Sequence, residues 1–548
     1  MKLNKTERAK NSFAPYDFHK KLTLVDLADL TEEERFYLKN YGIYNIKLNP
    51  ERFILRLRIA GGRISRDDLV FIVRIVKEYE LELLLTARAQ IELHGLTAQN
   101  ILEVWELLQQ NSISTLQTFT DNFRNIVSDP YDGLDESAQI EVYPLLVDMQ
   151  NIFLGKKEWM GMLPRKFNTA ICGNKISQVH FFSNDLFFGL ARKEEKWGFN
   201  IYLGGKNSEV AQDADIFVEP YEVPMMFEAV AKVYMQYGLR GSRAKTRLFH
   251  LIKEIGIESF VEKVSEFYPK SMEKKGILQI DKTSFSEFQK LKDNTFAYCY
   301  RSKFGQIDAT ALQELIYYAD KENCEIRVGV DQNLYLLGIK EKKIPFRPIL
   351  GASHVTACAG SHYCSLSLWN VKEETSYLPL EEIEAHNIQV GFSGCLKGCG
   401  RHYHADIGLV GLRTNLFGET QKAARVFLGG EYSRGEKTAR LIFGVVPLVH
   451  LKSVFEVIIN EFEASGEKDF EGFSRKYLNP LSTFFLMLWF LAKLYFKKPI
   501  NLELLSEEEL YQKLSTVEEF PKFSEDENYQ KSISVMLHSL WNDTDCIA

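Results

Sequence analysis

Hydrophobic and polar positions follow the same order twice along this chain. From Phe53, the run FILRLRIAGGRISRDDLVFIVRIVKEYELELLLTARAQIEL starts with alternating residues, turns at glycines, places apolar residues at steps of three and four, and ends in a further apolar stretch. From Phe296, at a constant offset of 243, FAYCYRSKFGQIDATALQELIYYADKENCEIRVGVDQNLYL repeats this order. Alternation is typical of half-buried strands, and the wider spacing is typical of amphipathic helices. Each copy is therefore predicted to form strand, turn, helix and strand.

A second pair of segments extends the repeat. LPRKFNTAICG (163–173) aligns with VGFSGCLKGCG (390–400), which places Cys172 opposite Cys399. YLGG ending at Gly205 matches FLGG ending at Gly430, and each is followed by a Val-Pro that opens a helical stretch. The pattern predicts an α+β fold, internally duplicated about a pseudo-twofold, with mixed β-sheets flanked by helices. Chance similarity of generic strand–helix–strand units is the alternative.

Composition excludes some classes of function. The 548 residues carry a formal net charge of −7, which argues against a nucleic-acid partner because phosphate binding needs a basic surface. The opening MKLNKTERAKNSF is polar and lacks the apolar core of a secretory signal. The stretch 481–496 is strongly apolar, but Lys493 interrupts it and it is shorter than the about 20 residues of a membrane span. We therefore expect a cytoplasmic protein without a membrane anchor.

Four of the eight cysteines form two tight pairs. Cys358 and Cys364 lie in ACAGSHYC, and Cys395 and Cys399 lie in SGCLKGCG, so the spacing is C-x5-C, thirty residues, then C-x3-C. Thiolates suit iron–sulfur clusters or zinc, and four complete a [4Fe–4S] ligand set. Structural zinc sites favour shorter knuckles such as C-x2-C. Four unrelated buried thiols are the alternative.

These residues also carry a family resemblance. Ser393-Gly394-Cys395, Cys399 and the following Asp406-Ile407-Gly408-Leu409 resemble the signature of the siroheme nitrite/sulfite reductases, and Thr356-Ala357-Cys358 with Gly360 and Cys364 resembles that family's first cysteine pair. The resemblance covers residues from about 45 to 450. It implies a six-electron reductase with siroheme and a [4Fe–4S] cluster, in which Cys399 bridges the cluster to the siroheme iron. It also implies ferredoxin as the external electron donor, and the chain has no obvious flavin module or dinucleotide fingerprint of its own.

The resemblance and the repeat together predict six segments. They are an N-terminal, partly extended arm (1–45), a first ferredoxin-like half domain (46–118), a first siroheme- and substrate-binding domain (119–285), a second ferredoxin-like half domain (286–345), a second siroheme- and [4Fe–4S]-binding domain (346–478), and a helical C-terminal extension (479–548).

Cations are expected around the anion and the tetrapyrrole, because siroheme carries eight carboxylates and arginine's planar fork suits carboxylates. By resemblance the catalytic residues are Arg56, Arg124, Lys166 and Asn168, and the cofactor-binding residues are Arg88, His94, Arg165, Arg240 and Arg243, besides Cys399. Strand alternation predicts that Arg58 shares the face of Arg56. For any one arginine, a solvated surface charge is the ordinary alternative.

Three residues bear on the substrate. Asn168 stands where sulfite-reducing relatives commonly carry a second lysine, which favours nitrite, a monoanion, over sulfite, which can carry two charges. His94 resembles the sulfite reductases instead, and Glu92 replaces a usual glutamine. We predict reduction of nitrite to ammonia, with reduction of sulfite to sulfide as the alternative. A non-catalytic iron–sulfur electron carrier would not need the quartet Arg56, Arg124, Arg165 and Lys166, and a zinc-stapled binding protein is a further alternative.

Overall fold

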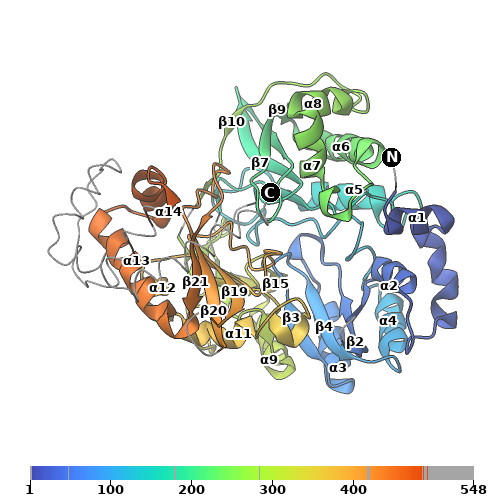
Figure 1. The fold of residues 1–548 in the computed structure, drawn as a ribbon, viewed down its shortest axis with the longest axis horizontal. Coiled ribbons are helices and arrows are strands. Elements are labelled where there is room, and N and C mark those ends of the chain that lie inside the picture. The colour runs from blue at the N-terminus through green and yellow to red at the C-terminus, as the bar shows by residue number, and fades with distance from the viewer. Residues whose placement is uncertain are drawn as a thin grey trace. The chain divides into compact units, whose positions relative to one another are not determined.

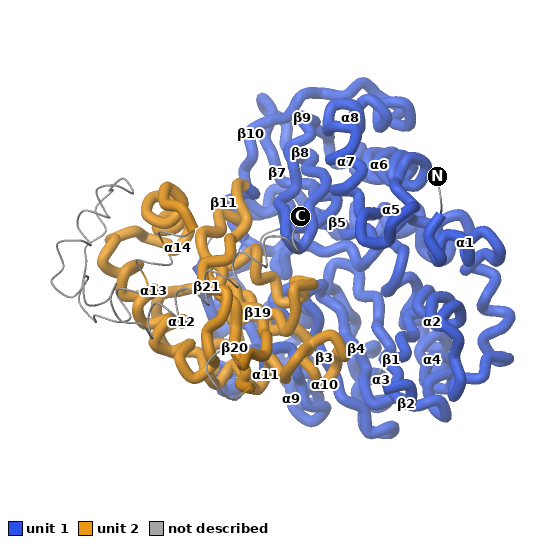
Figure 2. The backbone as a smooth tube through the Cα atoms, viewed as in Figure 1, with its two compact units in different colours: residues 1–349, 433–435 blue, residues 350–432, 436–548 orange. Residues whose placement is uncertain are grey.

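The computed structural model describes residues 3–46, 49–177, 181–282, 284–415 and 420–483, together with Leu486 and Phe490. They form two compact units (Figure 2): residues 1–349 with 433–435 make unit 1, and residues 350–432 with 436–548 make unit 2. The predicted helical extension (479–548) therefore lies almost entirely outside the described residues. Among the residues that are described, no helix has the length and apolar character needed to cross a membrane.

Unit 1 holds nine α-helices and sixteen strands among its described residues. The helices are α1 Lys5–Ser12, α2 Glu32–Leu38, α3 Arg66–Glu78, α4 Ile101–Gln110, α5 Tyr143–Phe153, α6 Val223–Tyr237, α7 Leu248–Ile255, α8 Ile257–Ser265 and α9 Ala309–Glu322. The strands are β1 Ile43–Ile46, β2 Asn49–Arg56, β3 Glu82–Leu85, β4 Ile91–Leu96, β5 Thr169–Cys172, β6 Ile176–Ser177, β7 Leu186–Lys193, β8 Lys196–Leu203, β9 Gln212–Val218, β10 Ile277–Leu278, β11 Asp281–Lys282, β12 Phe288–Lys290, β13 Phe296–Tyr300, β14 Gln306–Ile307, β15 Glu325–Val328 and β16 Leu334–Ile339.

The first repeat is confirmed in unit 1. One sheet has the order β1-β2-β4-β3, extended by β14, and another has the order β12-β13-β16-β15. The offset of 243 relates α3 to α9, β3 to β15 and β4 to β16 at their first residues. Even the helix caps correspond, because Ser65 and Asp308 each accept backbone N–H groups of the first turn. The two segments are therefore copies of one unit down to the caps.

The two copies contact each other reciprocally. Arg63 forms a β-bridge with Arg327, and Gln306 pairs with Leu84, which are the same two positions with the copies exchanged. At the equivalent glycines φ is +76° at Gly62 and +90° at Gly305. A Cβ at Gly62 would lie 2.1 Å from the carbonyl oxygen of the facing strand's Val328. The bridge geometry is that of a pseudo-twofold axis, and it requires glycine for close approach.

The second repeat is also present, with one correction to its register. Sheet β5-β7-β8-β9 has its first pair parallel and the rest antiparallel. Strands β18 Val390–Ser393, β19 Ile407–Thr414, β20 Gln421–Leu428 and β21 Arg440–Pro447 of unit 2 repeat this order and these directions. Thr169 pairs with Leu186, as Val390 pairs with Ile407, so Cys172 corresponds to Ser393. The predicted correspondence of Cys172 with Cys399 is wrong, because it followed a shared Cys-Gly ending instead of the strand pairing.

Helices cover one side of each of these sheets. In unit 1, α6, α7 and α8 lie beside strands β7 to β9 (Figure 1) and form a core with residues such as Phe199, Phe227 and Tyr234. Unit 2 adds β17 Val355–Ala357 and the helices α10 Gly360–Tyr363, α11 Val371–Glu374, α12 Leu380–Ala385, α13 Leu451–Ser465 and α14 Phe470–Phe473.

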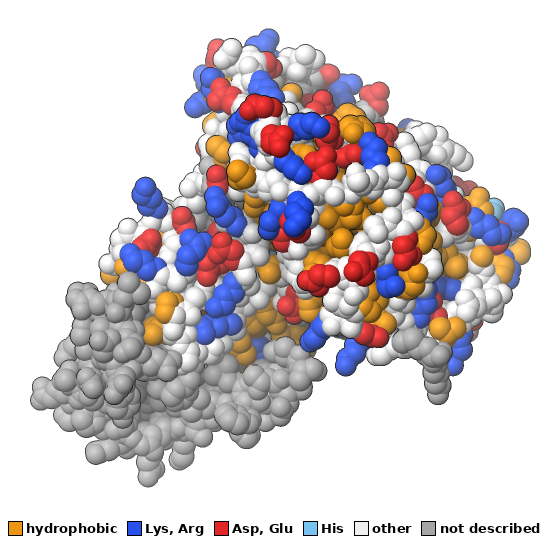
Figure 3. Space-filling model, turned by 90° about the horizontal axis from the view of Figure 1, so that it is seen from above, with side chains coloured by type: hydrophobic (Ala, Val, Ile, Leu, Met, Phe, Trp, Pro, Cys, Tyr) orange, Lys and Arg blue, Asp and Glu red, His pale blue; other side chains and the backbone are white. Residues whose placement is uncertain are grey.

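Acidic and basic side chains are interspersed on the face drawn in Figure 3.

The N-terminal residues differ from the partly extended arm predicted for 1–45. Residues 5–41 form α1, a 3-10 segment Pro15–Leu24, α2 and a 3-10 turn Lys39–Tyr41. Thr31 and Glu34 make a capping box at α2, which fixes its start. Phe18, Tyr37 and Leu38 are buried in the core of unit 1. The segment is therefore a packed helical part of the domain.

Candidate functional site

The site in unit 1 begins with a loop that a buried arginine fixes. Arg58 is 7% exposed and donates to the carbonyls of Leu116 (3.0 Å), Gln117 (3.0 Å) and Phe123 (2.8 Å). Burial lowers its pKa to about 9. Strand β2 ends at Arg56, but Arg58 reaches the same loop as Arg56, whose Nη1 donates to the Thr118 carbonyl (3.3 Å). The buried guanidinium of Arg58 holds the backbone of residues 116–124 in place.

Arg124, carried by this loop, lies among other predicted cations. Its guanidinium donates to the carbonyl of Thr120 (3.1 Å). Its pKa is lowered well below the usual value, because the group is buried and because Arg56, Arg165 and Arg88 lie nearby. The structure thus brings together four of the predicted site arginines, from β2, from the turn between β3 and β4, and from the loops before β5.

Two of these arginines have well-defined partners. Arg88 donates to Asn184 Oδ1 (3.0 Å) and to the carbonyl of Asn125 (2.5 Å). Arg56 stacks on the Phe119 ring, 3.9 Å from its centroid, and its Nε donates to Glu92 Oε1 at 2.6 Å. The planar groups are therefore held in fixed orientations.

His94 lies on β4 and contacts the same carboxylate. Its Nε2 is 3.0 Å from Glu92 Oε2, and both side chains are buried. Although burial would raise the pKa of Glu92, the charge of Arg56 and the hydrogen bond from His94 lower it to about 2. Glu92 is ionised at neutral pH, so its Oε2 accepts a hydrogen bond from His94 Nε2.

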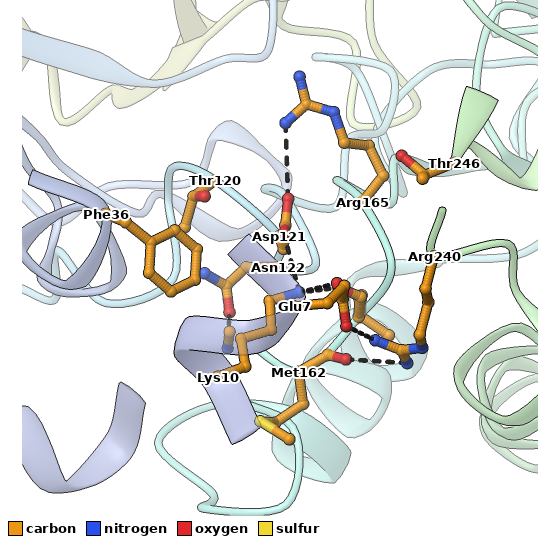
Figure 4. Close-up of polar contacts among 12 residues, drawn as sticks. Glu7, Lys10, Phe36, Thr120, Asp121, Asn122, Met162, Arg165, Arg240 and Thr246 are labelled. Carbon is orange, nitrogen blue, oxygen red and sulfur yellow. Dashed lines mark hydrogen bonds and ion pairs between the residues drawn. The ribbon is translucent and has the colours of Figure 1, made fainter. Parts of the chain in front are cut away.

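A buried aspartate connects further cations (Figure 4). Asp121 has no exposed surface and pairs with Lys10 (2.8 Å), Arg165 (3.5 Å) and Arg243, whose Nη2 lies 2.7 Å from Oδ1. Lys10 lies on α1 and also donates to Glu7 Oε1 (2.7 Å) and to the Leu163 carbonyl (2.6 Å). Burial would raise the pKa of Asp121, but Lys10 and Arg243 lower it. Helix α1 therefore anchors the loops that carry Arg165 and Arg243.

Arg240 has a different set of contacts from those expected of a cofactor ligand. Its guanidinium pairs with Glu7 and donates to the carbonyls of Met162 (3.2 Å) and Met235 (2.8 Å). Asn4, the cap of α1, bonds to the backbone of Arg240 in turn. These contacts hold the N-terminal helix, and the predicted role of Arg240 toward siroheme stays a prediction.

The predicted substrate residues Lys166 and Asn168 directly precede β5. Lys166 is half-buried beside Arg165. Asn168 is 5% exposed, and its backbone N–H donates to Asp185 Oδ2 (2.8 Å), whose carboxylate pairs with Arg247 (2.7 Å). The side-chain Oδ1 of Asn168 is buried and accepts no hydrogen bond from the described residues. The amide oxygen can therefore accept a hydrogen bond from a ligand.

The four predicted cluster cysteines all lie in unit 2, where two parallel strands end. Cys358 follows β17 directly, and Cys395 follows β18 by two residues. Strands β17 and β18 are paired in parallel, so both loops start at the same edge of the sheet. Burial raises the pKa of the Cys364 thiol, and neighbouring Cys399 and Cys395 raise it further. The strand pairing therefore gathers the two distant pairs.

Backbone N–H groups point at the sulfur atoms. Cys358 Sγ accepts from Gly394 N (3.1 Å) and Gly360 N (3.4 Å). Burial nevertheless raises the Cys358 pKa to about 12, and the positive charge of a bound metal would favour its thiolate. Among the described residues, no three His, Cys, Asp or Glu side chains are placed to hold a single metal ion. Four thiols with N–H donors to sulfur fit the chemistry of an iron–sulfur cluster.

Three residues of the site were not predicted from the sequence. Asp121 and Lys10 form the buried ion network, and Lys39 lies close to it. Burial and the charges of Arg243 and Arg165 lower the pKa of Lys39 to about 8. Asp121 stands three residues before Arg124, in the segment that the resemblance singled out for its arginine. An acidic residue so close to a predicted site cation could have indicated an ion pair. Lys10 and Lys39 fall in the segment that was expected to be an arm.

Comparisons with known proteins agree with this architecture. Residues 46–111 match the nitrite/sulfite reductase ferredoxin-like half domain, and residues 119–272 match the nitrite and sulphite reductase 4Fe-4S domain. The second range is the first copy of the repeat and contains one cysteine, Cys172, whereas the four-cysteine set lies in the second copy.

Whole-chain relatives point the same way. The chain is 29% identical over 426 residues to the ferredoxin–nitrite reductase of Synechococcus elongatus, covering 72% of this chain and 83% of the relative. It is 25% identical over 512 residues to the chloroplastic ferredoxin–nitrite reductase of Spinacia oleracea, covering 84% and 86%. The Mycobacterium tuberculosis NirA protein shares the fold, with a TM-score of 0.78 at 22% identity over 88% of this chain and 97% of that one.

The matched domains, the duplicated fold and the gathered thiols lead to one assignment. These findings support a member of the nitrite and sulphite reductase family, an oxidoreductase of the siroheme type, and the family implies siroheme and a [4Fe–4S] cluster as its cofactors.

Proposed function

We propose that this protein reduces nitrite to ammonium, with electrons supplied singly by a ferredoxin. The reaction takes up six electrons and eight protons and releases two waters. The observation that carries the proposal is the gathering of Arg56, Arg88 and Arg165 around Arg124, with Lys166 beside Arg165. The four arginines are half-buried, and although Glu92 and Asp121 compensate Arg56 and Arg165, such a gathering of cations favours an anionic ligand.

These residues would bind and orient the anion. Arg124 is held by carbonyls of its own loop, which leaves its charge to act on a ligand. In a buried site such a charge acts through a lower dielectric than in water. Cations fixed before the reaction stabilise negative charge as it develops on oxygen, without reorganisation. Lys166 would serve as a proton source for the departing oxygen.

The cofactors have candidate ligands in each unit. Cys358, Cys364, Cys395 and Cys399 would hold the cluster. Arg88, Arg165 and Arg243 would pair with tetrapyrrole carboxylates. Siroheme and the cluster, when bound, supply the redox chemistry.

Asn168 supports nitrite as the substrate. It places a buried, uncharged amide in the segment that follows Lys166, with an unused oxygen. The relatives from Synechococcus elongatus and Spinacia oleracea are ferredoxin–nitrite reductases, which supports both this substrate and the donor. Sulfite is the second candidate, because His94 resembles the residue of sulfite reductases.

The test is steady-state reduction of nitrite and of sulfite by the holoenzyme, side by side, with one chemically reduced ferredoxin as donor. We expect a higher kcat/KM for nitrite, with ammonium as the product. A higher kcat/KM for sulfite would refute the proposal in favour of the second candidate. Loss of turnover when the ferredoxin is replaced by a reduced pyridine nucleotide is the expected control.

A further inference from the structure

Glu92 is a buried carboxylate with both oxygens engaged. It lies on β4 directly across from Arg56 on β2. Oε1 accepts from Arg56 Nε at 2.6 Å, and the same guanidinium also contacts it through Nη2. Oε2 lies 3.0 Å from His94 Nε2. The Glu92 side chain is 7% exposed and that of Arg56 24%, so the carboxylate is largely withdrawn from solvent.

The ion pair leaves Arg56 able to donate but removes its net charge. Contacts with Glu92 and with the Thr118 carbonyl (3.3 Å) use three of the five N–H donors of the guanidinium. Glu92 stays ionised because Arg56 and His94 lower its pKa. Arg56 and Glu92 together therefore present hydrogen bonds and a dipole, with no unit charge.

The positive charges of the other site arginines, Arg124 and Arg165, have different partners. Arg124 contacts carbonyl oxygens, so its charge is not neutralised by those partners. Arg165 shares Asp121 with Lys10 and Arg243. Arg56 and Arg124 both donate to the Thr118 carbonyl, so the carboxylate on β4 lowers by one unit the positive charge beside Arg124.

We infer that Glu92 determines substrate specificity, by neutralising Arg56 so that the anion site suits a monoanion better than a dianion. The inference rests on the proposed function, because it takes Arg56 as part of the anion site. A dianion gains twice as much as a monoanion from each added positive charge. A unit charge acting over roughly 10 Å at an effective dielectric of about 20 changes that preference by roughly tenfold. A tenfold change corresponds to about 1.4 kcal/mol.

The test compares the holoenzyme with the Glu92→Gln variant, which keeps the shape and removes the charge. Two quantities are measured for nitrite and for doubly charged sulfite at one pH. They are kcat/KM with one reduced donor, and Kd from absorption titration of the oxidised holoenzyme without turnover. We expect both sulfite-to-nitrite preference ratios to rise about tenfold in the variant.

Glu141→Gln is the matched control, because Glu141 also pairs with an arginine, Arg63 (3.0 Å), but on an exposed side chain. We expect both ratios to stay at the wild-type value. Unchanged ratios in Glu92→Gln would overturn the inference while leaving nitrite reduction intact. A wild type that fails to reduce nitrite would overturn the proposed function, and the Kd ratio would still test the role of Glu92.

A second variant separates charge from packing. Glu92→Asp keeps the negative charge on a shorter side chain, so we expect it to keep the wild-type Kd ratio. If Glu92→Asp shifted the ratio as far as Glu92→Gln does, the effect would come from packing and the inference would be wrong. Should Glu92→Gln fail to bind its cofactors, a shifted Kd ratio in Glu92→Asp would likewise overturn it.

Discussion

Lys10→Met removes the central cation of the buried network without changing the length of the side chain greatly. The Lys10 ammonium fills all three of its donor directions, with Glu7, Asp121 and the Leu163 carbonyl at 2.7, 2.8 and 2.6 Å. Removing one partner of a buried ion pair costs about 3–5 kcal/mol. Asp121 keeps Arg165 and Arg243, and Glu7 keeps Arg240, so we expect the lower end, about 3 kcal/mol.

Two measurements on the holoenzyme check this reasoning. The thermal midpoint should fall by roughly 6–12 °C, since about 1 kcal/mol shifts a large domain by roughly 2–4 °C. The KM for nitrite should rise about tenfold, or 1.4 kcal/mol, with a smaller change in kcat, because the loops that carry Arg165 and Arg243 lose their anchor. Lys5→Met is the control, since Lys5 lies on the same helix but is exposed and pairs with Glu32. An unchanged midpoint would refute the energetic argument, and a lowered midpoint with unchanged KM would refute the link from α1 to the site.

Three further outcomes are expected. Gly62→Ala should destabilise unit 1 by several kcal/mol in urea unfolding, because its new Cβ would meet a carbonyl oxygen at 2.1 Å. Gly466→Ala, also at positive φ but with nothing within 4 Å, should cost only about 1 kcal/mol. Equal losses of stability in the two variants would contradict the clash. Cys358→Ser should lose non-haem iron and acid-labile sulfide while Cys172→Ser keeps them, and the reverse would sink the ligand assignment. Because the pKa of Glu92 is depressed from 4.5 to about 2, its stabilising contribution is present above pH 4.5 and is lost as pH falls toward 2. The unfolding free energy of Glu92→Gln should therefore fall less than that of wild type as pH is lowered across that window. Parallel curves of unfolding free energy against pH would show that the ion pair is not stabilising.

The repeat was predictable from the sequence where local pattern and register coincide. Helix α3 and helix α9 begin where the spacing of apolar residues and the caps place them, since these signals lie within a few neighbouring residues. The correspondence between β5 and β18 was not predictable from the sequence, because hydrogen bonding between neighbouring strands decides it. A shared Cys-Gly ending in the two segments suggested another alignment. The gathering of the cysteine pairs follows from parallel pairing of β17 and β18.

The cations of the site were predicted by resemblance, but the carboxylates that neutralise them were not. Asp121 joins residues of α1, of the loop before β5 and of the turn after α6, and nothing in the local sequence connects these segments. Arg58 shows the same limit, because alternation assigns it to a strand face, whereas burial of its guanidinium among carbonyls decides its role. Partners distant in sequence are set by tertiary packing.

The reciprocal bridges Arg63–Arg327 and Gln306–Leu84 bear on how this chain arose. An isologous contact of this kind is what two identical subunits make across a twofold axis. A chain that encoded one copy would have formed it as a homodimer, in which each β3 edge was covered by its partner. Fusion of two such copies would keep the contact and free the copies to diverge. The present chain has diverged in this way, since the four-cysteine set lies in one copy and the anion-site arginines lie in the other.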